Sequence, residues 1–258
     1  ELMEKFFEEG SLTEEELAQG LTVAIAAQEF FPVFCCSAAK NMGSGRIMGF
    51  INDIAPSPDQ MEPALLTDGS TLACDSSDDP TLFIFKTMSE PKIGNVSYFK
   101  LYSGKLNSGD ELYNERTGTS ERFNQLFISN GKIRDHVDQL VAGDIGVTVK
   151  LKNSHTNDSL GPKGKERNID PIHFPEPRIR TAVKPPSKSD LEKLMKALHT
   201  IQEEDPTLIL EQSQELKQTI LHGQGQLHLD VIKYRVEKAY DIHMDFIRPK
   251  ISYRETIT

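Results

Sequence analysis

The sequence predicts a multidomain α+β protein, because the spacing of apolar residues changes twice along its 258 residues. Residues 1–58 mix helical and strand-like patterns, which is typical of the edge of an α/β sheet. Residues 80–177 show short strands separated by glycine turns, and residues 178–247 alternate strands with helices. We therefore expect five successive segments, at 1–58, 59–79, 80–177, 178–247 and 248–258.

The net charge of −10 is concentrated at one end of the chain. Residues 1–79 hold 3 Lys and Arg against 15 Asp and Glu, whereas 80–177 and 178–258 each hold 13 against 12. The whole-chain charge therefore gives no support for nucleic-acid binding, although a local basic patch can still contact phosphates.

Cysteine and histidine content argues against disulfides and metal sites. Two of the three cysteines, Cys35 and Cys36, are adjacent, and the third is Cys74, so a reducing, cytoplasmic location is expected. The seven histidines are scattered without a metal-binding spacing, so we expect no metal. No apolar run approaches the length of a membrane span, about 18 residues, so no membrane contact is expected. The protein is also predicted to be a monomer.

Residues 1–31 are predicted to be helical, followed by a strand at 31–36 and a second helical pattern at 47–54. Ser11 to Glu16 carry a capping signature, Ser or Thr followed three residues later by Glu. One strand cannot form a sheet, so we expect most of this α/β domain to lie upstream of residue 1. Residues 59–79 carry prolines and an acidic, serine-rich run, which indicates a linker.

Residues 80–177 are predicted to form a closed β-barrel. Strands are expected at 81–86, 94–102, 111–114, 122–128 and 144–150, with turns at Ser103-Gly104 and Asn107 to Asp110. Short strands at this spacing, with glycine between them, are typical of all-β barrels.

Residues 178–247 are predicted to form a β-α-β-β-α-β unit of the ferredoxin-like kind. Ser187 or Ser189 is expected to cap a helix with apolar residues at i, i+3, i+4 and i+7. That helix should stop before Asp205-Pro206. Two strands, a helix from about residue 226 and a last strand at 242–246 complete the order.

The junction at residues 222–228 reads HGQGQLH. Gly223 and Gly225 are predicted to allow a positive-φ turn from strand to helix. A phosphate cradle is the alternative, because a helix N-terminus attracts anions, but the loop contains no Lys. His222 and His228 lie six residues apart, which does not suit a shared metal on one helix face.

Several runs, in collinear order, resemble elongation factor G. The runs are PVFCCSAA from residue 32, SGKLNSGD from 103, AGDI from 142, KNSHTNDSL from 152, EDPTL from 204, GQGQLHL from 223 and PKISYRET from 249. Each is weak alone, but all seven occur in the family's order. The resemblance implies a fragment covering the edge of a P-loop GTP-binding domain, domain II, domain III and the first strand of domain IV.

The resemblance implies that the intact parent binds GTP and Mg, docks on the ribosome and promotes translocation of tRNA and mRNA. Ser37 and Ala38 would then belong to the last guanine-contacting loop of the parent. Residues 1–258 contain no GxxxxGK[ST] phosphate loop and no Asn-Lys-x-Asp run. We therefore expect no GTP hydrolysis by this fragment, no catalytic residue within it and no cofactor of its own.

Candidate contacts to the ribosome or to a neighbouring domain lie at two places. The junction supplies Gly223, Gln224, Gly225, Gln226 and His228, and a turn of the barrel supplies Lys132 and Arg134. The competing interpretation for all of them is turn geometry and packing, and the charged run from Lys163 to Arg167 is expected to be solvated.

Departures from the family pattern leave two alternatives open. Gln226 stands where Glu is usual, Cys36 stands where Gly is usual, and Thr156-Asn157-Asp158 lacks the usual Gly. These departures favour a divergent paralogue or a ribosomal protection factor with weak or lost GTPase activity. Without the resemblance, the residues alone indicate a barrel and a ferredoxin-like interaction module with no chemistry of its own.

Overall fold

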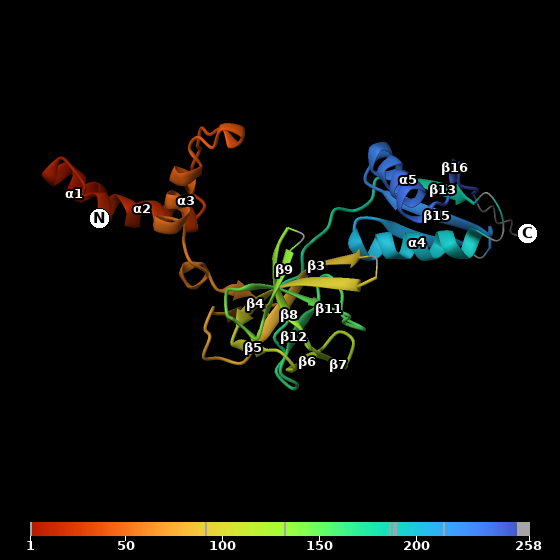
Figure 1. The fold of residues 1–258 in the computed structure, drawn as a ribbon, viewed down its shortest axis with the longest axis horizontal. Coiled ribbons are helices and arrows are strands. Elements are labelled where there is room, and N and C mark those ends of the chain that lie inside the picture. The colour runs from red at the N-terminus through yellow and green to blue at the C-terminus, as the bar shows by residue number, and fades with distance from the viewer. Residues whose placement is uncertain are drawn as a thin grey trace, which may run out of the picture.

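The computed structural model describes residues 2–90, 92–131, 133–185, 187, 190–213 and 215–251. Three parts follow one another along the long axis: N-terminal helices, a β-barrel and a compact unit of two helices on a sheet (Figure 1). This arrangement confirms the predicted multidomain α+β class.

The N-terminal part consists of three helices without a core. They are α1 (Leu2–Glu9), α2 (Glu14–Ala26) and α3 (Ser44–Asp53). The predicted cap of α2 is present: Thr13 Oγ1 accepts the Glu16 N–H, and the Glu16 carboxylate accepts the Thr13 N–H. No residue between 2 and 58 is buried.

The strand predicted at residues 31–36 does not form. These residues are extended but unpaired and exposed, and only an isolated bridge joins Ser37 to Met42. The prediction was wrong because strand propensity becomes a strand only beside a partner, and the described residues provide none here.

Residues 59–79 contain more structure than the predicted linker. After a short 3-10 helix, Pro58–Gln60, strands β1 (Ala64–Leu65) and β2 (Thr71–Leu72) pair antiparallel. Leu66 and Leu72 are buried in a small cluster with Phe83 and Ile169. The hairpin is therefore packed on the outside of the barrel.

The barrel is built on an eight-stranded antiparallel sheet in the order β7-β6-β12-β3-β4-β11-β8-β9, with β5 and β10 paired separately. Its strands are β3 (Thr81–Glu90), β4 (Gly94–Ser103), β5 (Lys105–Asn107), β6 (Glu111–Asn114), β7 (Thr119–Arg122), β8 (Leu126–Asn130), β9 (Ile133–Val137), β10 (Gln139–Val141), β11 (Ile145–Val149) and β12 (Ser159–Gly161). Leu112 of β6 and Leu126 of β8 share one core with Phe99 of β4, so the sheet wraps around that core.

Five of these strands were not predicted: β5, β7, β9, β10 and β12. Each has only three to five residues, too few for an alternating pattern to stand out. No ladder joins the outer strands β7 and β9 among the residues the structure describes, so the predicted closure is not made by those two strands.

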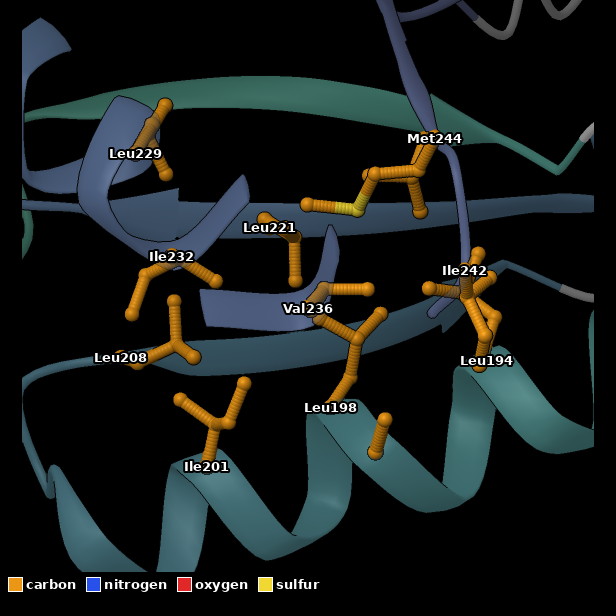
Figure 2. Packing of buried hydrophobic residues seen from close by; sticks show 12 residues of the cluster. Leu194, Leu198, Ile201, Leu208, Leu221, Leu229, Ile232, Val236, Ile242 and Met244 are labelled. Atoms are coloured by element: carbon orange, nitrogen blue, oxygen red, sulfur yellow. The ribbon is translucent and has the colours of Figure 1, made fainter. Parts of the chain in front are cut away.

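The C-terminal unit has the predicted ferredoxin-like order and topology. It comprises β13 (Ile179–Lys184), α4 (Asp190–Glu204), β14 (Ile209–Ser213), β15 (Gln218–Gly223), α5 (Gln226–Tyr240) and β16 (Asp245–Ile247). The antiparallel sheet has the order β14-β15-β13-β16. Leu198 and Ile201 of α4 meet Ile232 and Val236 of α5 over Leu221 of β15, in a core of twelve buried residues (Figure 2).

The predicted caps and ends of this unit are only partly described. Ser189 lies outside the described residues, as do residues 252–258 of the segment at 248–258. Ser187 Oγ donates to the Asp190 carboxylate at the start of α4, 2.6 Å away.

Candidate functional site

The predicted junction residues do come together, where β15 ends and α5 begins. His228 is the centre of the junction. Its Nδ1 accepts the backbone N–H of Gln224 at 3.1 Å, and its Nε2 lies 2.9 Å from Asp205 Oδ2. Because Nδ1 is an acceptor, Nε2 carries the proton and donates to Asp205. The site therefore consists of the β15–α5 junction together with the turn after α4.

Asp205 is held as a carboxylate by its neighbours. Burial raises its pKa, but hydrogen bonds from Thr207 and His228 outweigh burial and leave the pKa below its usual value. The Thr207 hydroxyl lies 2.6 Å and the Thr207 N–H 3.0 Å from Asp205 Oδ1. Asp205 is thus more than a helix stop, because it attaches the start of α5 to the end of α4.

The Asp205–His228 pair is not arranged for proton transfer to a substrate. Both ring nitrogens of His228 are occupied by hydrogen bonds inside the chain. A general base needs a free position within hydrogen-bond reach of the proton that it removes. The pair is therefore a structural fastening.

Neither glycine of the junction forms the predicted positive-φ turn. Gly225 caps α5 with φ −179° and ψ 175°, an extended conformation open to any residue, and Gly223 has no positive φ either. A Cβ on Gly223 would lie 2.8 Å from Leu229 Cδ2, whereas a Cβ on Gly225 would meet nothing within 4 Å. The prediction was wrong because close contact with the Leu229 side chain, and not backbone handedness, favours glycine at Gly223.

The outer side of the junction is exposed. The Gln226 side chain donates to Asp230 Oδ1 at 2.9 Å, one turn further along α5, and Leu227 is 78% exposed. Gln224 Nε2 donates to the Pro175 carbonyl at 2.8 Å, which holds the segment leading into β13. The exposed surface combines amide groups with one large apolar side chain, and residues 222–228 contain no Lys or Arg that could pair with a phosphate.

Arg134 lies on β9 and not in the predicted turn. It is opposite Ser129 in the β8–β9 pair, and both of its terminal nitrogens contact the Glu90 carboxylate. Its side chain is only 16% exposed. The turn was placed too late in the chain because β9 is short, and Lys132 lies outside the described residues.

Ser37 and Ala38 are far from the junction. They belong to the segment between α2 and α3, and these helices lie at the opposite end of the long axis from α5 (Figure 1). Ser37 exchanges two backbone hydrogen bonds of 3.0 Å with Met42, and Ala38 begins a short 3-10 helix. This tight turn is compatible with a base-contacting loop, and equally with a turn that only reverses the chain.

Sequence reasoning missed the charged residues that join the parts. Glu204 contacts the barrel and α5, and its only signal was its place before Asp205-Pro206. Lys165 and Arg167 pair with Asp79 and Asp78, so part of the charged run predicted to be solvated is neutralised by the acidic stretch before the barrel.

Among the described residues, no group of three or more His, Cys, Asp or Glu side chains is placed to hold a metal ion. Within the same residues, no helix is long and apolar enough to cross a membrane.

Two family comparisons match the chain in consecutive stretches. Residues 79–162 match the family described as elongation factor G domain 2, and residues 174–247 match elongation factor G, domain III. The two matches coincide with the barrel and the ferredoxin-like unit. The chain belongs to the elongation factor G family.

A solved structure supports the same assignment for the fold. A crystal structure of a protein from Thermus thermophilus is similar over 100% of this chain, with 29% identity and a TM-score of 0.80. The chain spans 37% of the length of that protein. The sequence matches to elongation factor G domains 2 and III and this structural similarity therefore agree on the fold.

One departure from the elongation factor G pattern has a structural explanation. Asn157, where the family usually has Gly, adopts φ +76°, and Asn tolerates this region better than most residues. Its side chain also exchanges two hydrogen bonds of 3.0 Å with the backbone of Ile172. The missing glycine therefore gives no support to a divergent function.

Proposed function

We propose that this chain is part of an elongation factor G-like protein that promotes GTP-dependent movement of tRNA and mRNA on the ribosome. The observation that carries the proposal is the succession of domain 2 and domain III in the family's order. In this proposal the intact protein binds GTP and Mg and works in the cytoplasm as a monomer, with Ser37 and Ala38 near the guanine base.

Residues 1–258 supply contact surfaces in this proposal and not the hydrolytic chemistry. The junction of Gly223, Gln224, Gly225, Gln226 and His228 is the candidate contact to the ribosome or to a neighbouring domain. It is supported by the exposed Gln226 and Leu227 on a rigid, hydrogen-bonded frame. Isothermal titration calorimetry with GTP should show no micromolar affinity for residues 1–258.

The decisive experiment uses the intact protein with purified ribosomes. Co-sedimentation with ribosomes and ribosome-stimulated GTP hydrolysis are expected. The absence of both would overturn the proposal.

The second candidate is a ribosome-binding paralogue or protection factor with weak or lost GTPase activity. Gln226 favours it, because Glu is usual there and the amide removes a charge from an exposed position. A translocation assay separates the two candidates. The main elongation factor should translocate faster with GTP than with a non-hydrolysable analogue, whereas the paralogue should show no such difference.

A further inference from the structure

The end of α4 contacts parts of the molecule that are far apart in sequence. Glu204 Oε1 accepts the backbone N–H of Ser89, on β3 of the barrel, at 2.8 Å, and Glu204 Oε2 forms an ion pair with Arg235 of α5. Next to it, Glu203 Oε2 lies 3.3 Å from the Asn95 side chain. One carboxylate thus joins the barrel to both helices of the ferredoxin-like domain.

The environment of Glu204 makes this contact strong. Its side chain is 12% exposed, against 39% for Arg235, so water competes weakly for the carboxylate. Hydrogen bonds between an ionised acceptor and a backbone N–H are stronger than neutral ones. Removing the acceptor would leave the Ser89 N–H to find water at a half-covered place.

Ser89 is well placed to transmit orientation. It lies near the tip of the β3–β4 hairpin, opposite Asn95 in the ladder, and this hairpin extends from the barrel toward α4 (Figure 1). The two strands pair from Thr81 to Glu90 on β3, with register shifts at Thr81/Leu82 and Ile84/Lys86, so the ladder from Lys86 to Glu90 is continuous up to the tip. Holding this tip therefore constrains the direction of the barrel.

The neighbouring residue connects the same corner to the β15–α5 junction. Asp205 holds His228 at 2.9 Å, and His228 in turn accepts the Gln224 N–H. Arg235 lies two turns beyond His228 on α5. The end of α4 therefore contacts this helix at two points, through Glu204 to Arg235 and through Asp205 to His228. A displacement of the start of α5 therefore pulls on the residue that adjoins the barrel contact.

We propose that Glu204 is a positioning residue that sets the angle between the barrel and the ferredoxin-like domain, and that Asp205 couples this angle to the β15–α5 junction. The coupling runs through two consecutive residues of one rigid helix end, and not through a long chain of side chains. It goes beyond the proposed ribosomal function and does not depend on it.

The test uses residues 1–258 in solution, without ribosomes, so its failure is distinguishable from failure of the ribosomal proposal. Amide exchange of Ser89 is measured by NMR, and residual dipolar couplings report the relative orientation of the two domains. In Glu204→Ala we expect Ser89 exchange to accelerate about tenfold, which corresponds to loss of one charged hydrogen bond, and the two domains to lose their common alignment.

The controls separate positioning from folding. Glu203→Ala removes only an exposed contact and should leave both readouts unchanged. Glu204→Gln keeps an acceptor for Ser89 but loses the Arg235 ion pair, so it should restore most of the Ser89 protection. In every variant, the couplings of each domain should still fit that domain's own structure with one alignment tensor, which shows that both domains remain folded.

His228→Ala tests the coupling to the junction. It should accelerate Ser89 exchange about twofold to fivefold, although it lies outside the barrel contact. Unchanged Ser89 exchange in this variant would overturn the coupling. Unchanged exchange and alignment in Glu204→Ala would overturn the positioning role itself.

Discussion

The N-terminal helices and the ferredoxin-like domain respond to similar sequence patterns in opposite ways. Between residues 2 and 58 no side chain is buried, whereas residues 179–247 enclose a core of twelve buried residues. Both regions form the predicted helices. Only the second forms its predicted strands, because helices satisfy their hydrogen bonds locally and strands need partners.

The contrast teaches which signals carry over from sequence to structure. The capping box at Thr13 and Glu16 needs only four consecutive residues and is present without any core. The apolar run at residues 31–36 needed a neighbouring strand and remained unpaired. We expect local substitutions to matter at the first kind of place, and packing substitutions only where a core exists.

The largest expected effect tests the core directly. Leu198→Ala removes a fully buried side chain between α4 and α5 and should cost about 3 kcal/mol. Native-state hydrogen exchange measures the loss, at the β15 amides for Leu198→Ala and at the α2 amides for the control variant. Leu17→Ala on α2 is the matched control, at a side chain that is 52% exposed, and should cost less than about 0.5 kcal/mol. Equal costs would mean that the N-terminal helices have a core of their own.

The barrel offers a polar counterpart to this apolar core. Asp158 is buried and accepts hydrogen bonds from Arg116 at 2.7 Å, the His155 N–H at 2.8 Å and Asn114 at 2.9 Å. Asp158→Asn places an amide donor against these donors and should cost about 2 kcal/mol, measured as faster exchange of the β12 amides. Asp68→Asn, at an exposed turn, should have a clearly smaller effect.

The glycine pair at the junction separates packing from backbone freedom. Gly223→Ala brings a Cβ to 2.8 Å from Leu229 and should cost about 1–2 kcal/mol by overpacking. Gly225→Ser adds a capping oxygen where α5 now has no side-chain cap and should stabilise the helix by about 0.5 kcal/mol. Thermal unfolding of the two variants should move in opposite directions, and a shift in the same direction would contradict the assignment.

Acid should weaken the Asp205 fastening in a defined pH range. Burial raises the pKa of Asp205, but the hydrogen bonds from Thr207 and His228 hold it below its usual value. Its contribution to stability is complete above the unfolded pKa, about 3.9, and is lost as the pH falls through the lower folded pKa. NMR titration of the carboxyl carbon should show a depressed midpoint, and Thr207→Val should raise it. An unshifted midpoint would show that the hydrogen bonds do not outweigh burial.

The smallest expected effect is at the exposed Gln226. Gln226→Glu places a second carboxylate one turn from Asp230, which costs a few tenths of a kcal/mol, while the start of α5 favours negative charge. The two effects oppose each other, so stability should change by less than about 0.5 kcal/mol. A larger change in ribosome binding of the intact protein, measured by co-sedimentation, would mark Gln226 as a contact. If stability and ribosome binding both change only slightly, Gln226 is a surface residue that does not contact the ribosome.

The fold could be predicted to the level of its domains. Long apolar periodicity revealed α4 and α5, and Thr81 to Lys86 revealed β3, because each pattern covers most of its element. The shortest barrel strands, such as β5 and β12, carry too few residues for a pattern, and their positions depend on the strands beside them.

The predicted junction residues lie together in the structure, but the predicted reason for their glycines was wrong. The run from Gly223 to His228 was predicted to be a site because it places two glycines at a strand-to-helix junction. Its glycines suggested a backbone with positive φ. The structure instead explains Gly223 by the close approach of the Leu229 side chain, which no local sequence pattern reveals. Likewise, the partners of His228 and Glu204 lie 23 and 115 residues away, beyond the range of any spacing argument.

The three consecutive residues Glu204, Asp205 and Pro206 each have a different structural role. Glu204 contacts the barrel, Asp205 contacts the start of α5, and Pro206 follows the end of α4. In a saturation library, this run should appear as one intolerant block, although each position would fail for a different reason. The effect of a double substitution within this run should be smaller than the combined effects of the two single substitutions. Once the first substitution has separated the end of α4 from its partners, the second has fewer contacts left to remove.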